Sequence, residues 1–296
     1  MRTFRWLACA LGASLVGVVL VASLAAQDSR ERTLYVSAVD HNGDPVQGLG
    51  PDAFIVREDG VRREVLRVTP ATDPIDLALL VDNSQAAEHD IPFIRDALTK
   101  FTAAVSSTNP TAIIGLAERP TILADYSTNP KKLADGVGRI FATHGAGMTL
   151  LDAVVEVVNG LNKRESPRAA IIAVITDGPE FTFRFSKDVT NTLTRAHVPF
   201  YAVALGQFYY SDEQGIRERT FLLNEGTTES GGERVALVSP NGIEPSLLKI
   251  GHELTSQYKV VYSRPESLIP PRNVDIASAR SGVTMRGTPA RGQKEK

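Results

Sequence analysis

Two runs of apolar residues stand out along the chain. Residues 75–81 and 169–176 are almost entirely aliphatic. Short runs of this kind are typical of strands buried on both faces, as in a parallel sheet that helices cover on both sides. Each run is followed by an acidic residue, Asp82 in the first case and Asp177 in the second. Because ligands of such sheets collect at the carboxyl ends of the strands, the two carboxylates mark a candidate site.

Around these runs, segments with helical and strand periodicity alternate. This alternation predicts an α/β fold with a doubly wound, mostly parallel, Rossmann-like sheet flanked by helices and joined by right-handed crossovers. The expected helices cover 93–105, 133–141, 150–161, 185–196, 213–224 and 247–254. The other expected strands of this domain cover 111–116, 121–126, 200–205 and 234–238.

Both flanks of this domain show the two-residue alternation of half-buried strands. Strands are expected at 34–39, 54–58, 61–68, 258–263, 274–277 and 283–286, with turns at Asn42-Gly43-Asp44 and Asp59-Gly60. We expect the N- and C-terminal strands to pair in one small antiparallel β module. The expected organisation is therefore a signal segment at 1–26, the first part of the module at 27–72, the α/β domain at 73–256, the returning strands at 257–287 and a disordered polar tail at 288–296.

The first 26 residues have the pattern of an export signal. Arg2 and Arg5 precede an apolar run, and Ser23-Leu24-Ala25 places small residues where a signal peptidase cleaves. Cleavage near Ala25 would give a protein that is secreted or lies in the periplasm or cell envelope. The length of the apolar run leaves an uncleaved anchor as the alternative, and no other membrane span is predicted. The single cysteine, Cys9, lies in this segment, so the mature chain would fold without disulfides.

Charge and motif content argue against nucleic-acid binding and against an enzyme. The chain has 32 basic and 34 acidic residues, without a basic run that could follow a phosphate backbone. It also lacks the Gly-x-Ser-x-Gly motif of serine hydrolases. His252-Glu253-Leu254-Thr255-Ser256 begins like a zinc-protease helix but lacks the second histidine, so we interpret it as the exposed side of the last helix.

Four oxygen-bearing side chains are expected to converge at the carboxyl edge of the sheet: Asp82, Ser84, Thr149 and Asp177. Such hard oxygen ligands are those that Mg²⁺, Mn²⁺ and Ca²⁺ take. Asp82-Asn83-Ser84, the threonine before a helix and Asp177-Gly178 resemble the metal-ion-dependent adhesion site of von Willebrand factor type A domains. The order of elements over residues 75–254 resembles that fold as well.

The flanking segments extend this resemblance. TLYVSAVDHNGDPVQGLGPDAFIVREDGVRREV and SQYKVVYS are similar to the exported von Willebrand factor-related proteins of acidobacteria-like bacteria. The resemblance implies a binding or adhesion protein whose ion is completed by an acidic side chain of a partner protein. The face expected to contact that partner contains Asn83, Gln85, Gly147, Gly178, Phe181 and Tyr209. Ala86 replaces the second serine of the motif, which should weaken the site, above all for Mg²⁺ with its strict octahedral geometry.

Each of these features has a structural alternative. Asp82 and Ser84 could cap the following helix, Thr149 to Asp152 has the shape of a capping box, and Asp177-Gly178 could be a simple turn. The aromatic residues near this edge could form a buried lid or anchor a partner; they are Phe181, Phe183, Phe185, Phe208, Tyr209 and Tyr210. At the level of function, the alternatives are a metal-free scaffold of the cell envelope and a hydrolase that uses a divalent ion to activate water.

Overall fold

The computed structural model describes residues 29–206, 213–265 and 269–293. Its larger part is a six-stranded sheet with the order β10-β9-β8-β5-β6-β7. All neighbouring strands run parallel except the edge pair β6 and β7. The strands are β5 (Asp76–Val81), β6 (Thr111–Gly115), β7 (Thr121–Ser127), β8 (Ala169–Ile175), β9 (Phe200–Leu205) and β10 (Arg234–Leu237). This sheet confirms the predicted α/β class.

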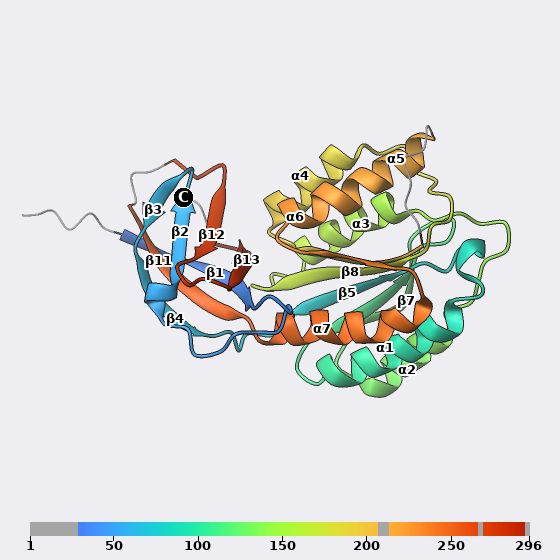
Figure 1. Cartoon of the computed structure of the whole chain (residues 1–296). Helices are drawn as coiled ribbons and strands as arrows, with labels where there is room; N and C mark the ends of the chain where they lie inside the picture. Colours follow the sequence, from blue (N-terminus) through green and yellow to red (C-terminus); the bar gives the residue numbers. More distant parts are fainter. Residues whose placement is uncertain (1–28, 207–212, 266–268, 294–296) are drawn as a thin grey trace, which may run out of the picture.

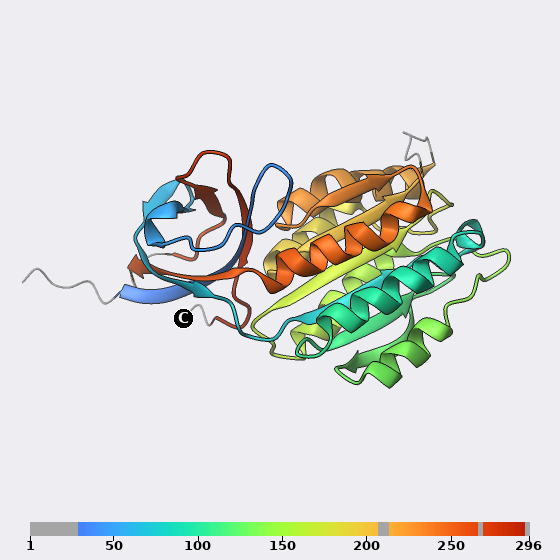
Figure 2. The same cartoon turned by 60° about the horizontal axis from the view of Figure 1, so that its bottom comes forward.

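Helices cover both faces of the sheet (Figure 1). One layer contains α1 (Ile91–Val105), α2 (Pro130–Gly138) and α7 (Ile243–Thr255), and Figure 2 shows these helices in front of the strands. The other layer contains α3 (Leu150–Asn162), α4 (Ser186–Ala196), α5 (Gln214–Phe221) and α6 (Thr227–Glu229). All side chains of β5 and β8 are buried because each strand supplies one set of alternate residues to each layer.

A second unit of two small antiparallel sheets forms the predicted β module. One sheet has the order β13-β1-β11-β4 and the other β12-β2-β3, so strands from both ends of the chain pair as expected. The strands are β1 (Ser29–Val39), β2 (Phe54–Glu58), β3 (Val61–Arg63), β4 (Val65–Pro70), β11 (Tyr258–Pro265), β12 (Val274–Ser278) and β13 (Thr284–Pro289). Short 3₁₀ helices lie at η1 (Pro51–Ala53), η2 (Gln85–Ala87) and η4 (Pro240–Gly242).

Three predicted elements were wrong in detail. The single strand at 61–68 is two strands, because the chain crosses from the sheet of β2 to the sheet of β11 at Glu64. The helix expected at 133–141 begins earlier and ends at Gly138. The helix expected at 213–224 is α5, followed by a π-helical segment η3 (Leu222–Gly226) that leads into α6.

The tail predicted to be disordered is folded as far as it is described. β13 continues to Pro289, and the backbone N–H of Ala290 donates to Thr33. The guanidinium of Arg291 donates to the carbonyls of Ala196 and Ser166, which lie in the α/β domain. A polar composition alone was therefore a poor guide here, because this segment finds its hydrogen-bond partners on a distant part of the chain.

Buried arginines join the β module to the amino ends of the parallel strands. Arg168, just before β8, donates to the carbonyls of Asp73 and Leu254 and to the side chain of Gln257. The module therefore occupies one end of the sheet, and the carboxyl ends of the strands lie at the other (Figure 1). Among the residues that the structure describes, no helix has the length and apolar character needed to cross a membrane.

Candidate functional site

Asp82 lies at the carboxyl end of β5 and is completely buried. Its Oδ1 accepts a hydrogen bond from the backbone N–H of Ser84 at 2.9 Å. Its Oδ2 accepts from both the backbone N–H and the hydroxyl of Thr176, at 3.1 and 2.5 Å. The carboxylate therefore ties the end of β5 to the end of β8. It does not cap the following helix, so that interpretation was wrong.

Ser84 follows Asp82 and is also completely buried. Its side chain makes no capping hydrogen bond to η2, which begins at the next residue. Within the described part of the chain, Ser84 Oγ has no hydrogen-bond partner at all. Most buried hydroxyls are satisfied, and an unsatisfied one lowers stability by about 1–3 kcal/mol. A hydroxyl oxygen without a partner at this position is available to bind a metal ion.

Thr149 is the N-cap residue of α3, but its side chain does not cap that helix. Its hydroxyl donates to the carbonyl of Leu116 at 2.8 Å, which leaves the oxygen lone pairs for another interaction. Asp152 bonds to Thr182 and Arg184 and not to the start of the helix. The capping-box prediction was therefore wrong.

Glu180 takes over the role of the cap. Its Oε1 accepts from the backbone N–H of Leu151 at 3.4 Å, while its buried Oε2 has no partner among the described residues. Burial raises the pKa of Glu180 to about 8, although the nearby charge of Arg219 and the helix N–H groups act in the opposite direction. Sequence analysis missed Glu180, and its position shortly after Asp177 was the only available signal.

Asp177 and Gly178 bring the end of β8 next to the loop after β5. Asp177 is exposed. A Cβ atom placed on Gly178 would lie 2.5 Å from the Ala86 methyl and 3.6 Å from Ser84 Oγ. Only a glycine therefore fits where this turn touches Ala86, and Ala86 offers only a methyl where the motif has a serine hydroxyl. The turn interpretation and the site interpretation are compatible.

Negative charge accumulates at this edge. Burial raises the pKa of Asp90, and the charges of Asp177 and Asp82 add to that effect. In the described part of the chain, no three His, Cys, Asp or Glu side chains gather as a metal-binding group. A divalent ion at this edge would therefore need the hydroxyls of Ser84 and Thr149 beside its carboxylates, and the unpartnered Ser84 Oγ fits that requirement.

The residues expected to contact a partner have different environments. Gln85 is exposed and accepts a hydrogen bond from the Gly145 N–H, whereas Asn83 uses its side chain to hold Leu116, Ala117 and Phe141. Gly147 is buried beneath Phe181, and Gly178 is buried against Ala86. Tyr209 lies outside the described residues. Phe181 and Gln85 are thus the exposed members of this set among the described residues.

The loop after β8 carries several exposed aromatic rings. Phe181, Phe183 and Phe185 are 60%, 95% and 55% exposed, so the buried-lid interpretation was wrong for these three. Phe208, Tyr209 and Tyr210 lie outside the described residues. Exposed rings beside a polar centre are suited to anchor a protein partner.

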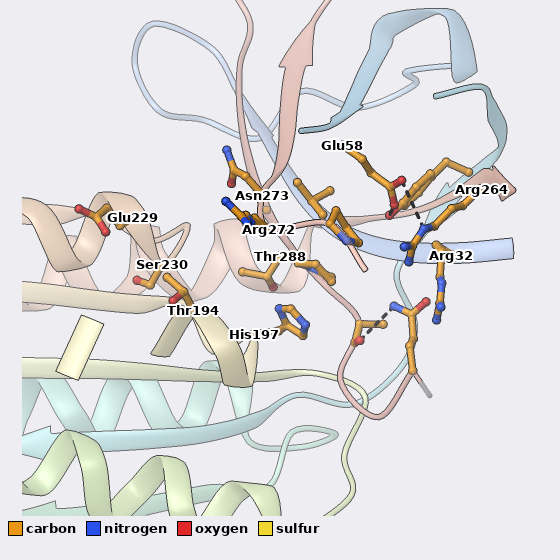
Figure 3. Close-up of a pocket in the computed structure, with 17 residues that line it drawn as sticks. Arg32, Glu58, Thr194, His197, Glu229, Ser230, Arg264, Arg272, Asn273 and Thr288 are labelled. Carbon is orange, nitrogen blue, oxygen red and sulfur yellow. Dashed lines mark hydrogen bonds and ion pairs between the residues drawn. The ribbon is translucent and has the colours of Figure 1, made fainter. Parts of the chain in front are cut away.

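A cavity of about 180 Å³ lies at the opposite end of the sheet, between α4 and the β module (Figure 3). Its lining includes Glu58, Arg264 and Tyr262. Glu58 accepts from Tyr262 at 2.8 Å, pairs with Arg264 at 3.5 Å and also pairs with Arg63 outside the cavity. These contacts join strands of the β module to one another, so we assign the charged lining to the packing of the module.

Comparison with known proteins identifies the fold. The sequence matches no protein-family profile, and no curated protein is similar in sequence. Among solved structures, a von Willebrand factor type A protein from Catenulispora acidiphila superposes with a TM-score of 0.51 at 10% identity, covering 89% of this chain and 66% of the other. The chain has the von Willebrand factor type A fold. This assignment concerns the fold alone, because a sequence identity of 10% does not show that two proteins share an activity.

Two other solved structures are similar over part of this chain. Proximal thread matrix protein 1 from the mussel byssus gives a TM-score of 0.48 at 9% identity and covers 63% of this chain. The BatB protein of Bacteroides thetaiotaomicron gives 0.45 at 13% identity and covers 62% of this chain and 100% of its own. This chain spans half of the mussel protein and 66% of the Catenulispora protein.

Proposed function

We propose that this von Willebrand factor type A protein binds a partner protein through the carboxyl edge of its sheet, with a divalent metal ion in the contact. The observation that carries the proposal is Ser84 Oγ, a buried oxygen that has no hydrogen-bond partner among the described residues and lies beside Asp82 and the Gly178 turn. Ser84, Thr149, Asp82 and Asp177 would hold Mg²⁺, Mn²⁺ or Ca²⁺. An acidic side chain of the partner would complete the coordination, and Phe181 and Phe183 would pack against the partner's surface. We propose recognition and not catalysis.

The site is best tested with Ser84→Ala. Loss of this hydroxyl should weaken Mn²⁺ and Mg²⁺ binding by about tenfold or more, because changing even a residue that only orients a metal ligand typically lowers the affinity by about 10- to 100-fold. Stability without metal should stay equal or rise slightly, because the variant removes an unsatisfied buried oxygen. Calorimetric titration and thermal unfolding of the same samples measure both effects.

Two variants serve as comparisons for this test. Asp177→Ala should weaken ion binding at least as much as Ser84→Ala, because it removes a charged ligand, whereas Asp135→Ala, which changes an exposed aspartate on α2, should leave ion binding unchanged. Asp82→Ala is unsuitable because Asp82 holds Thr176 and Ser84 in place. Equal ion binding in Ser84→Ala and the unmodified protein would refute the site.

The main alternative is a metal-free interaction scaffold, favoured by the Ala86 methyl packed against Gly178. In that case the unmodified protein should bind no ion, and Ala86→Ser should restore binding if the remaining ligands are in place. Ion binding by the unmodified protein that tightens in Ala86→Ser would instead support a working, weakened site.

We further propose that the N-terminal segment directs the protein out of the cytoplasm. Expression of the full chain in a bacterial host should give a periplasmic or secreted product whose first residue is Ala26 or Gln27. Cell fractionation and N-terminal sequencing would measure this. A full-length product in the membrane fraction would indicate an anchor, and a full-length product in the cytoplasm would contradict export.

A further inference from the structure

A buried arginine from outside the motif reaches the candidate metal site. Arg219 on α5 is only 1% exposed and is the largest of the fully buried side chains among the described residues. A Cβ atom on Gly215, one helical turn earlier, would lie 2.0 Å from the carbonyl oxygen of Glu180. The helix therefore presses directly on the loop after β8. Because residues four apart share a helix face, Arg219 points toward the same loop.

The contact that Arg219 makes lies next to the proposed ligands. Its Nη1 donates a hydrogen bond to the carbonyl of Gly178. Gly178 follows Asp177 in the chain, and its Cα faces the Ala86 methyl and Ser84 Oγ. The guanidinium therefore binds the backbone of the residue that follows Asp177 and that faces Ser84.

The guanidinium of Arg219 lies close enough to the carboxylates of the site for them to influence its pKa. Burial lowers the pKa of Arg219, while Asp82, Asp177 and the ionised form of Glu180 act in the opposite direction. A guanidinium stays protonated throughout the working range of a protein, so the charge is permanent. The protein therefore supplies a positive charge of its own at this edge, without a bound metal ion.

We propose that Arg219 is a resident cation of the metal site that partly neutralises Asp82 and Asp177 and thereby keeps the affinity for divalent ions low. This inference rests on the proposed metal site. Two carboxylates near each other repel unless a cation lies between or beside them, and here the chain supplies one itself. The edge therefore stays folded without a metal ion, and a divalent ion that binds there must do so against the guanidinium charge.

The test compares Arg219→Gln with Arg219→Lys. Glutamine removes the charge and keeps a neutral polar side chain, which is shorter than that of arginine, whereas lysine keeps the charge and loses the planar fork. We expect Arg219→Gln to bind Mn²⁺ on the order of tenfold more tightly than the unmodified protein, because a repulsive charge near the ion is gone. Arg219→Lys should bind Mn²⁺ like the unmodified protein. Calorimetry gives the affinities, and the rise in melting temperature on adding Mn²⁺ gives an independent measure.

The outcomes separate this inference from the proposed function. Equal Mn²⁺ affinity in Arg219→Gln and the unmodified protein, or weaker affinity in Arg219→Gln, would mean that Arg219 only tethers the Gly178 turn, and would overturn the inference alone. Absence of Mn²⁺ binding in both proteins would refute the metal site, and this inference with it.

A measurement on the unmodified protein covers the case in which Arg219→Gln does not fold. The side-chain N–H signals of a buried guanidinium can be observed by NMR in ¹⁵N-labelled protein. Substoichiometric Mn²⁺ should broaden the Arg219 signal strongly, because the ion binds beside it, and should leave those of the distant Arg168 unchanged. An unaffected Arg219 signal at Mn²⁺ concentrations that calorimetry shows to be bound would overturn the inference.

Discussion

Replacing Glu253 with leucine should lower the free energy of unfolding by about 3–5 kcal/mol. Glu253, on α7, is 3% exposed, and its Oε1 accepts from the Tyr201 hydroxyl at 2.9 Å and from Arg286 Nε at 2.8 Å. Burial alone would lower the pKa of Arg286, but hydrogen bonding to Glu253 and its charge raise it. The leucine variant leaves this buried cation with Glu233 as its remaining acidic partner. Urea unfolding at pH 7 measures the loss.

Two further proteins control this experiment. Glu31→Gln breaks an ion pair with Arg67 in which both side chains are largely exposed, and it should leave the unfolding midpoint unchanged. The double variant Glu253→Leu with Arg286→Met removes both charges and should recover much of the stability, because no unpaired buried charge remains. A midpoint for Glu253→Leu equal to that of the unmodified protein would contradict the role of this pair in joining the domain to β13.

Stability should fall as pH rises from about 5 to 8, and Glu180→Gln should remove much of that fall. The folded protein raises the pKa of Glu180 from 4.5 to about 8, chiefly through burial. Between these values the folded state holds a proton that the unfolded chain has released, so the stabilising effect is complete below pH 4.5 and is lost as pH rises toward 8. Each pH unit in this window changes stability by about 1.4 kcal/mol, so the whole effect is on the order of 5 kcal/mol.

Urea unfolding at several pH values between 5 and 8 measures this slope. Glutamine keeps the shape and carries no charge at any of these pH values, so its curve should be flatter. Glu156→Gln, an exposed residue of α3, should keep the slope of the unmodified protein. If the Glu180→Gln slope equals that of the unmodified protein, the buried carboxyl of Glu180 is not the group that titrates.

The burial of the central strands could be predicted from the sequence, because the amino-acid composition of each strand segment indicates it. A strand with apolar residues at every position has two buried faces, and β5 and β8 each have helices on both sides. The convergence of Asp82 with Asp177 followed from the same prediction, because parallel neighbouring strands end at the same edge of a sheet. The two-residue alternation at both ends of the chain likewise predicted the pairing of β1 with β11 and β13.

The hydrogen-bond partners of the buried polar side chains could not be predicted in this way. Periodicity records which face of an element is apolar, but a hydrogen bond depends on a partner that another segment supplies. Glu253 was assigned to an exposed helix face and is buried because Arg286 and Tyr201 meet it there. Arg219 lies 41 residues from Gly178, whose carbonyl it binds.

For this protein, then, local patterns of apolar residues were enough to predict the α/β class, the β module formed from both ends of the chain and the edge of the sheet at which Asp82 and Asp177 lie, because burial leaves such patterns in the chain. The folded arrangement was needed to show that Ser84 Oγ lacks a hydrogen-bond partner among the described residues, that Glu180 and not Thr149 caps α3, and that Arg219 lies beside the site. Those facts depend on contacts between distant segments, which no local pattern records.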